Sequence, residues 1–486
     1  MKRSYFGRTT VWVRLLSCLF IAATLLTAAS CTTVQPQTGN TVTTGGSVTE
    51  APNENKEYME AVNYDADFKI LSSTVSEEGG RHFSEFGGDI EADSIASEIF
   101  KRDKALEEKY NITFEIQTTV NWNTMLEQAY MSDDLLFHIA TPGASNAVYS
   151  ITNGYVADLN DYPHFDFTKD WWQTEAIEAM SVIGKNMMAI GDINLLAYDS
   201  VGIIFYSKTL AERLEITDLY DHVKAGTWTY ETMMEYVTAV TSETSGDGEF
   251  GMGDTYGLTG GSYSALCFVY AGNYSFVEKD EDGIPTMKED INDFVEYFQK
   301  VVYDHSLDYL IGYDKVKDDT NMFLESRQLF CINMLGYTAD FRNQQINYGL
   351  LPLPKWNAEQ EDYWTFPHQS ASTTICISPA NREYDMTSRV IEDMAYRSNR
   401  DVLSRYVEEN LFFRSLNGDT DSYDTVLNLL RHLNCDIFFS YKAGITEILR
   451  GLMDAHDTNI TSKFGKYSGV FKAQLESIVA GTADNK

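Results

Sequence analysis

A short acidic segment has the spacing that comes nearest to a metal site. Glu278, Asp280, Asp282, Gly283 and Glu289 fall at positions 1, 3, 5, 6 and 12 of a calcium-binding loop, which takes ligands from positions 1, 3, 5 and 12 and turns at the glycine. Position 1 is Glu where Asp is expected, a proline follows position 7, and no helix precedes the segment. We therefore interpret it as a solvated turn between two short strands, with a calcium loop as the alternative, and predict no metal and no cofactor.

The motifs of common enzyme classes are missing from the sequence. It contains no HExxH, no GxSxG, no GxxxxGK[ST], and no GxGxxG after a strand. The eight histidines form no i, i+4 pair and have none of the close spacings of zinc ligands. We therefore predict no catalytic residue. A pair of glycosidase carboxylates is brought together by folding and not by spacing, so the 72 acidic residues leave a hydrolase open.

Aromatic residues make up 13% of the chain, which makes a ligand site built on aromatic faces possible. Most large aromatic side chains pack in cores, and Trp228, just before a helix cap, is interpreted in this way. Trp171 and Trp172 are adjacent, so they cannot both point into one face of a strand or helix. We expect at least one of them to be exposed, at an interface or in a cleft.

The first thirty residues have the pattern of an export signal. Basic residues precede an apolar stretch from Leu15 to Leu26, and small residues follow it up to Ser30. The sequence Ala-Ala-Ser-Cys that ends at Cys31 resembles the lipobox of bacterial lipoproteins, in which the cysteine is lipidated. An ordinary secretory signal with an incidental cysteine is the alternative. We predict a signal peptide at 1–30, with lipidated Cys31 opening a flexible tether at 31–64.

Charge and cysteine content limit the partners and the chemistry of the folded part. With 37 basic and 72 acidic residues the net charge is −35, which disfavours nucleic acids and anionic membrane surfaces as partners and leaves a neutral or cationic ligand. Outside the cell the remaining cysteines can form disulfides or remain buried thiols, and their apolar neighbours in the sequence favour thiols. These cysteines are Cys267, Cys331, Cys376 and Cys435.

Strands that alternate with helices predict a parallel sheet covered on both faces. A strand at 68–71, a helix at 90–110 and a strand at 112–116 form a β-α-β unit. The pattern continues with a helix from about 122, a buried strand at 135–140 and a helix that ends at Gly154.

The chain is about three times a typical single domain of roughly 150 residues, so we expect two lobes. Apolar segments at 195–207 and 373–379 are expected to carry the chain to the second lobe and back, with a third crossing near 410–415. The predicted fold class is α/β with two lobes, parallel-rich sheets and flanking helices. Lobe 1 comprises residues 65–198 and 372–411, and lobe 2 comprises residues 199–371 and 412–486.

An ordered set of segments is similar to the extracellular solute-binding proteins of family 1, the lipid-anchored receptors of ABC importers. The resemblance covers nearly the whole chain after residue 30. Its most specific segments are KDWWQ (169–173) and YGLLPLPK (348–355), and the set also includes KRDKALEEKYNI (101–112), GYVADLNDYP (154–163), FYSKTLAERL (205–214), GTWTYETMMEYV (226–237) and TYGLTGG (255–261). It implies a periplasmic-binding-protein-like fold whose two lobes close over one ligand, often a sugar, and it implies no catalytic residues.

The resemblance also implies which segments contact the ligand. The residues that match the cleft-edge loops of the family are Gly143, Ser145, Asn146, Ser262, Tyr263, Asn333, Tyr337 and Tyr441, and Trp172 is added as an aromatic candidate. The implied function is the capture of a small neutral solute, a sugar or oligosaccharide, for ABC permease subunits, by a monomer at the outer face of the cell membrane. A surface-anchored glycan hydrolase, and an adhesin or sensor with the same fold, are the rival hypotheses.

Overall fold

The computed structural model describes most of the chain beyond residue 57. The described residues are 58–73, 83–91, 94–259, 262–305, 319–342, 344, 346–408, 418–437 and 444–483. The predicted signal peptide, Cys31 and the first part of the tether therefore lie outside the described residues, as do Tyr441 and the predicted crossing near 410–415. Among the described helices, none combines the length and the apolar character that crossing a membrane requires.

The first sheet confirms the predicted β-α-β unit. Its strands are parallel in the order β2-β1-β3, with β1 (Ala66–Ser73) between β2 (Ile112–Thr119) and β3 (Ile139–Ala140). The strand predicted at 135–140 is shorter than expected, because the preceding residues form a turn in which the Leu136 N–H donates to the Asp134 carbonyl. Helices alternate with these strands: α1 (Ser94–Tyr110), α2 (Trp122–Ser132) and α3 (Ala144–Thr152).

The chain leaves this sheet and later returns to it, as predicted. Beyond η1 (Leu159–Asp161) and α4 (Thr174–Met180), the segment predicted as one apolar crossing begins as α5 (Leu195–Asp199) before it becomes a strand. On the return, Ile375 pairs with Ala189, and Cys376 pairs with Ala140 of β3. Helix α13 (Tyr384–Arg397) and the π-helical turn η2 (Ser398–Leu403) then pack against α1.

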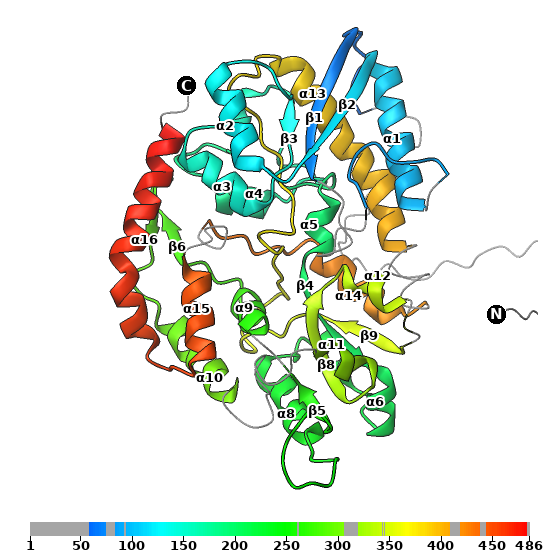
Figure 1. Cartoon of the computed structure of the whole chain (residues 1–486), viewed down its shortest axis with the longest axis vertical. Coiled ribbons are helices and arrows are strands. Elements are labelled where there is room, and N and C mark those ends of the chain that lie inside the picture. The colour runs from blue at the N-terminus through cyan, green and yellow to red at the C-terminus, as the bar shows by residue number, and fades with distance from the viewer. Residues whose placement is uncertain are drawn as a thin grey trace, which may run out of the picture. The chain divides into compact units, whose positions relative to one another are not determined.

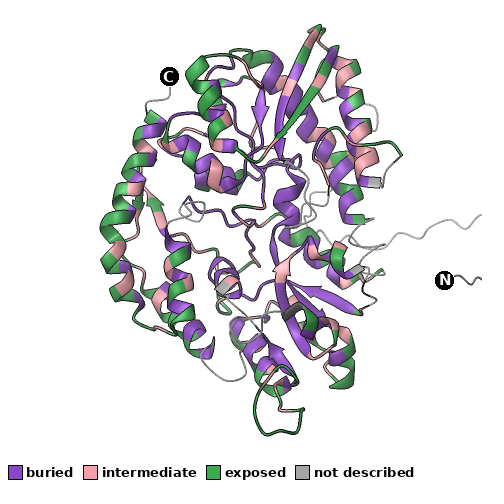
Figure 2. Ribbon diagram, in the orientation of Figure 1, coloured by how far each residue is buried: buried purple, intermediate pink, exposed green. Residues whose placement is uncertain are grey.

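The second sheet is mixed, with the strand order β5-β8-β4-β9. Strand β4 (Gly202–Ser207) is antiparallel to β8 (Gln328–Met334) and β9 (Tyr348–Leu351), and β5 (Tyr256–Leu258) is parallel to β8. Figure 2 shows β4 buried along its length, whereas β2 of the first sheet is largely exposed. The helices of this half are α6 (Lys208–Arg213), α7 (Leu219–Lys224), α8 (Tyr230–Val240), α9 (Ser262–Tyr270), α10 (Asn292–His305), α11 (Asp319–Leu324), α12 (Tyr337–Arg342), α14 (Thr420–Leu429) and α15 (Ile445–Asp454).

Two local sequence predictions for this half are confirmed. The Thr229 hydroxyl accepts a hydrogen bond from the Thr232 N–H at 3.2 Å and so caps α8. Cys267, Cys331, Cys376 and Cys435 are buried free thiols. These four cysteines are therefore core residues that form no disulfide bonds.

The acidic segment forms the predicted turn between two short strands. It joins β6 (Val277–Lys279) to β7 (Pro285–Met287) in an antiparallel hairpin. Asp280 Oδ1 accepts hydrogen bonds from the N–H groups of Asp282, at 3.0 Å, and Ile284, at 2.9 Å. The carboxylate is thus used to hold its own turn. Within the described ranges no group of three or more His, Cys, Asp or Glu side chains is placed to bind a metal ion.

The last helix, α16 (Ile460–Ala483), contacts both halves of the fold (Figure 1). Near its start, the Phe464 ring stacks on Phe276, with 5.5 Å between the ring centroids. Near its end, Lys185 Nζ donates a hydrogen bond to the Thr482 carbonyl oxygen at 3.1 Å. Gly481 lies so close to the end of α3 that an added Cβ atom would collide with backbone carbonyl oxygens there. The two sheets are therefore joined by a packed helix as well as by crossing segments, which the sequence reading did not foresee.

Replacing Gly481 by Ala is expected to lower the free energy of unfolding by about 1–3 kcal/mol, because the new methyl group overpacks the contact between α16 and α3. The same change at Gly469 of α16 is the matched control, since an added Cβ atom there meets no atom within 4 Å. There alanine is expected to stabilise the helix by up to about 1 kcal/mol. Urea denaturation of both variants measures the two effects, and the same sign for both would contradict the packing account.

Candidate ligand-binding site

Three segments from different parts of the chain meet where the two sheets join. The His368 N–H donates to the Ser200 carbonyl oxygen at 3.1 Å, directly after α5. The Gly336 N–H, between β8 and α12, donates to the Asp199 carbonyl oxygen at 2.8 Å. The Ser145 N–H, in the first turn of α3, donates to the Gln369 carbonyl oxygen at 3.2 Å. We call residues 367–374 the crossing segment, because they connect the second sheet to the first.

Six of the buried polar atoms that have no protein partner lie in the crossing segment or in elements around it, and others are spread over the rest of the fold. Within the described residues, these atoms have no hydrogen-bond partner: Thr141 Oγ1, the Tyr263 hydroxyl, Gln369 Oε1, Ser372 Oγ, Thr446 Oγ1 and Arg450 Nε. They come from the end of β3, from α9, from the crossing segment and from α15, which packs on α9. Each such atom costs about 1–3 kcal/mol when it is left unsatisfied, so these six are candidate hydrogen-bonding groups for a polar ligand.

Tyr263 of α9 and His368 of the crossing segment provide aromatic surface at this site. Their ring centroids lie 5.9 Å apart, and Phe366 lies 6.3 Å from Tyr263. The Cys267 thiol is the polar group beside the Tyr263 hydroxyl, and a thiol is a weak hydrogen-bond acceptor. The Cys267 thiol is therefore a weak partner for the buried Tyr263 hydroxyl.

His368 is neutral at physiological pH. Burial, and then the positive charge of Arg450, lower the pKa of His368 to about 4. Its Nδ1 atom accepts a hydrogen bond from the Ser370 N–H at 3.3 Å, so the proton of the neutral ring lies on Nε2. The ring therefore presents an uncharged donor.

The residues proposed from the sequence around α3 lie against the crossing segment. Gly143 is the N-cap of α3, and a Cβ atom there would lie 3.3 Å from the carbonyl oxygens of Gln369 and Ser372. Ser145 donates to the crossing segment as described above, and Asn146 is in the same helical turn. The first turn of α3 is therefore fixed to the segment that carries the unpaired polar atoms.

The residues proposed from β8 and α12 are near the same place. Tyr337, the first residue of α12, is half-buried, packs on Phe341 with ring centroids 6.1 Å apart, and acts electrostatically on Tyr263. Asn333 lies in β8, and its Oδ1 atom accepts from the Met334 N–H at 2.9 Å. Ser262 is the first residue of α9.

Trp172 is a core residue, which corrects the expectation that it faces a ligand. It is 3% exposed and its neighbour Trp171 is 9% exposed, so neither is exposed to solvent, which was one of the three placements expected for the pair. Both indole N–H groups donate to the Glu392 carboxylate of α13, each at 2.9 Å. A shared buried acceptor allows two adjacent tryptophans to pack inside the same half of the fold.

The crossing-segment residues were not identified from the sequence. His368, Gln369 and Ser372 lie in HQSAS, a polar stretch between the apolar residues at 364–366 and 373–379. A polar interruption inside an otherwise apolar crossing was the signal that would have identified them. Thr446 and Arg450 lie one turn apart on the amphipathic helix α15 and carry no such signal.

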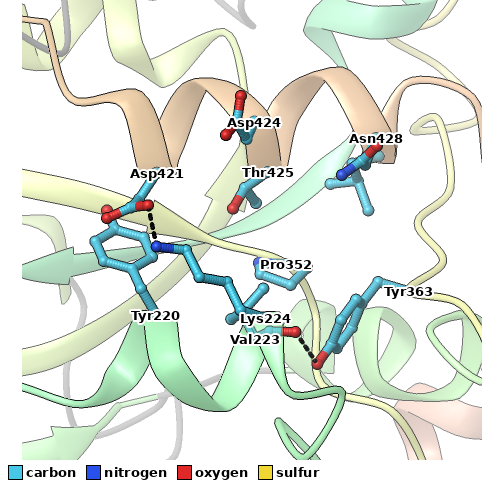
Figure 3. A pocket seen from close by; sticks show the side chains of 10 residues that line it. Tyr220, Val223, Lys224, Pro352, Tyr363, Asp421, Asp424, Thr425 and Asn428 are labelled. Atoms are coloured by element: carbon cyan, nitrogen blue, oxygen red, sulfur yellow. Dashed lines mark hydrogen bonds and ion pairs between the residues drawn. The ribbon is translucent and has the colours of Figure 1, made fainter. Parts of the chain in front are cut away.

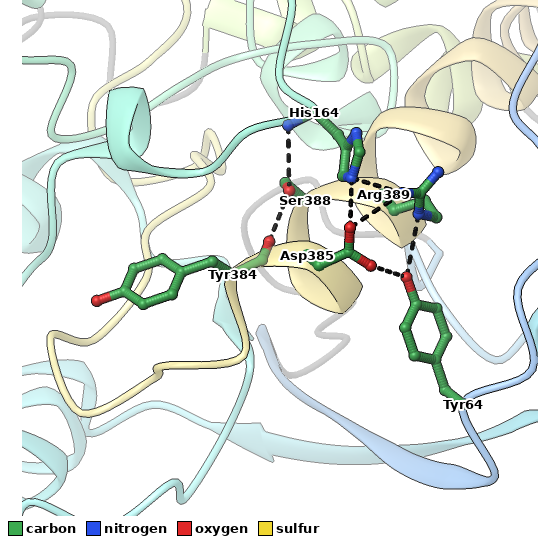
Figure 4. A network of polar contacts seen from close by, with 6 residues as sticks. All are labelled: Tyr64, His164, Tyr384, Asp385, Ser388 and Arg389. Carbon is green, nitrogen blue, oxygen red and sulfur yellow. Dashed lines mark hydrogen bonds and ion pairs between the residues drawn. The ribbon is translucent and has the colours of Figure 1, made fainter.

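A separate polar network has the residue types of a hydrolytic triad but not its geometry (Figure 4). The His164 ring faces Asp385 at 2.7 Å and Arg389 at 2.8 Å. Ser388 Oγ instead donates to a backbone carbonyl of α13 and accepts from the His164 backbone N–H at 3.3 Å. Asp385 also accepts from the Tyr64 hydroxyl, and hydrogen bonds from Arg389 and Tyr64 hold the pKa of Asp385 well below its usual range. The network fastens the start of the folded part to α13.

Comparison with solved structures shows the fold. A cyclo/maltodextrin-binding protein bound to maltotetraose is 12% identical, with a TM-score of 0.51 over 86% of this chain and 97% of that one. A sugar transporter protein from Rhizobium etli in an open conformation is 12% identical, with a TM-score of 0.52 over 86% of this chain and 100% of that one. A designed esterase is 11% identical, with a TM-score of 0.52 over 86% of this chain and 100% of that one. No family model and no curated protein matches the sequence.

The fold is therefore the α/β fold of two-lobed periplasmic binding proteins, as predicted. The first sheet belongs to one lobe and the second sheet to the other. In this arrangement the candidate site lies at the junction of the lobes, next to the crossing segment. At 11–12% identity the likeness establishes the fold alone.

Proposed function

We propose that this protein is an extracellular, lipid-anchored solute-binding protein that captures a small neutral solute between its lobes and delivers it to an ABC importer. The observation that carries the proposal is the group of unpaired buried polar atoms around the crossing segment. It lies on a fold shared with a protein that binds maltodextrins. The proposed lobes are residues 65–198 with 372–411 and residues 199–371 with 412–486, acting as a monomer.

The chemistry of the site favours a sugar or an oligosaccharide. The groups around Tyr263, His368, Gln369 and Ser372 are uncharged donors and acceptors beside aromatic faces, which suits a hydroxylated ring. Arg450 is a cation at the site, and Glu447, 3.7 Å from its Nη1 atom, offsets part of its charge. The net charge of −35 further disfavours an anionic ligand.

Thermal denaturation of residues 58–486 with a panel of sugars, peptides and amino acids tests the proposal. A ligand that binds only the folded state raises the melting temperature, by an amount that grows with its concentration over its dissociation constant. We expect a neutral saccharide to give the largest shift and to be recovered unchanged. Turnover of a glycan would instead support a surface hydrolase, and no shift with any saccharide would contradict the proposed ligand class.

Anchoring is proposed to depend on Cys31, which follows the small residues at the end of the signal. Replacing Cys31 by Ala is expected to release the protein from the membrane fraction into the medium, because a lipid chain is the proposed attachment. The released variant is expected to have the same melting temperature as the protein that keeps Cys31. Immunoblotting of the membrane and medium fractions measures the outcome. Retention of the variant in the membrane fraction would contradict the lipoprotein proposal.

A further inference from the structure

A pocket of about 300 Å³ lies on the second sheet's half of the fold, between α7 and α14 (Figure 3). Tyr220 and Tyr363 stand at opposite ends of it, with Pro352 between them and Thr425 of α14 facing it. None of its lining residues belongs to the crossing segment or to the other elements of the candidate site. The remaining lining residues are Val223, Lys224, Asp421, Asp424, Asn428 and Leu429.

Both tyrosine rings are held in place by their own hydroxyl groups. The Tyr220 hydroxyl lies 2.9 Å from Asp419 Oδ2, to which it donates, and Lys208 pairs with the same carboxylate at 2.5 Å. The Tyr363 hydroxyl donates to the Val223 carbonyl oxygen at 3.2 Å. Because each hydroxyl is used within the protein, the rings offer the pocket fixed carbon faces. Rings that are already immobilised lose little conformational entropy when a ligand packs on them.

The polar groups of the pocket favour an uncharged ligand. Lys224 pairs with Asp421 at 2.5 Å, so each charge is offset by the other. Asp424 is exposed, and in Figure 3 its carboxylate points away from Pro352. The hydroxyl of Thr425 and the amide of Asn428 supply neutral hydrogen-bonding groups from successive turns of α14. Fixed carbon faces combined with such groups match a ring that carries hydroxyls on its edge and C–H groups on its faces.

We propose that this pocket is a second binding site, which takes a single polyhydroxylated ring such as one sugar unit. Its volume of about 300 Å³ is at the small end of ligand pockets, which suits one sugar ring. The described lining residues all come from the half that contains the second sheet, so occupation of this site does not require the lobes to close. A free sugar is therefore expected to bind in this pocket even when the candidate site at the junction of the lobes is altered by mutation.

Saturation-transfer NMR with D-glucose as the probe tests this site on the 58–486 body. Asn428→Trp fills the pocket from the exposed side of α14 and is expected to weaken glucose binding at least tenfold. Leu427→Trp is the matched control, because Leu427 is the adjacent residue, is 40% exposed and does not line the pocket. Tyr263→Ala weakens binding at the candidate site beside the crossing segment and is expected to leave this glucose signal in place. Circular dichroism and melting temperature establish that each variant is folded.

The outcomes separate this proposal from the proposed function. Loss of the glucose signal in Asn428→Trp but not in Leu427→Trp or Tyr263→Ala supports the second site, whatever the junction binds. An unchanged signal in folded Asn428→Trp overturns it, as does a signal that disappears only with Tyr263→Ala. Choline is the charged probe of similar size. Choline binding that Asp424→Asn abolishes would show that the pocket selects a cation and would also overturn the proposal.

Discussion

Replacing Glu392 by Ala is expected to lower the free energy of unfolding by about 3–5 kcal/mol. Its carboxylate accepts four hydrogen bonds: from the indole N–H groups of Trp171 and Trp172, each at 2.9 Å, from the Tyr58 hydroxyl at 3.2 Å and from the Asp166 N–H at 3.3 Å. Both indoles are buried, so alanine would leave two desolvated donors without an acceptor and open a cavity between them. Urea denaturation followed by tryptophan fluorescence measures the loss.

An exposed glutamate provides the control for Glu392. Glu108→Ala, on the solvent side of α1, is expected to change the free energy of unfolding by no more than about 0.5 kcal/mol. Equal effects of the two substitutions would contradict the account of the Trp171–Trp172 packing.

The same carboxylate predicts a pH dependence of stability. Burial raises the pKa of Glu392 to about 7, above the value of 4.5 for an exposed glutamate. The folded state therefore holds the proton more tightly than the unfolded state, so this contribution is complete below pH 4.5 and is lost as the pH rises through 7. In Glu392→Gln, which does not titrate, this fall in the free energy of unfolding between pH 5 and 8 is expected to be absent.

Replacing Tyr263 by Ala is expected to weaken binding of the saccharide that gives the largest thermal shift by about thirtyfold. Truncating an aromatic residue in a desolvated contact costs on the order of 2 kcal/mol, which corresponds to that factor. Tyr263 lies beside His368, and its buried hydroxyl has the Cys267 thiol as a weak acceptor. Tyr337→Ala, at the start of α12, is expected to act in the same direction. Titration calorimetry gives the dissociation constants.

Stability and affinity are measured together for these tyrosines, because a tyrosine that only packs in its lobe would lower the melting temperature without changing affinity. Tyr149→Ala is the matched control, since Tyr149 is an exposed tyrosine on α3, one turn beyond Ser145. It is expected to bind like the parent. Parent-like affinity in both Tyr263→Ala and Tyr337→Ala would place the ligand elsewhere.

Much of the fold follows from local sequence patterns. The β-α-β unit is visible because strand and helix periodicities differ, and the cap at Thr229 is a contact between residues three apart. The antiparallel pairing of β4 with β8 and β9 was not predicted, because its partners lie more than a hundred residues away. The position of α16 between the two halves was not predicted for the same reason, since only folding brings Gly481 to the end of α3.

The candidate site was predictable only in part, and for a related reason. Segments similar to a known family pointed to Gly143, Tyr263 and their neighbours, which the fold brings to the crossing segment. Trp172 was misassigned because its acceptor, Glu392, is 220 residues away in the chain. Without that partner, an indole N–H appears to need solvent or a ligand. His368 was missed because its pKa and contacts arise from burial and from Arg450 of α15.

The most direct test of the central claim is small-angle X-ray scattering of the 58–486 body, with and without a saturating concentration of the saccharide that binds most tightly. Two lobes that close on a solute at their junction become more compact. We predict a measurably smaller radius of gyration with the saccharide, and a smaller decrease in Tyr263→Ala at the lowest concentration that saturates the parent. An unchanged radius in the parent, with binding established by calorimetry, would contradict capture by lobe closure.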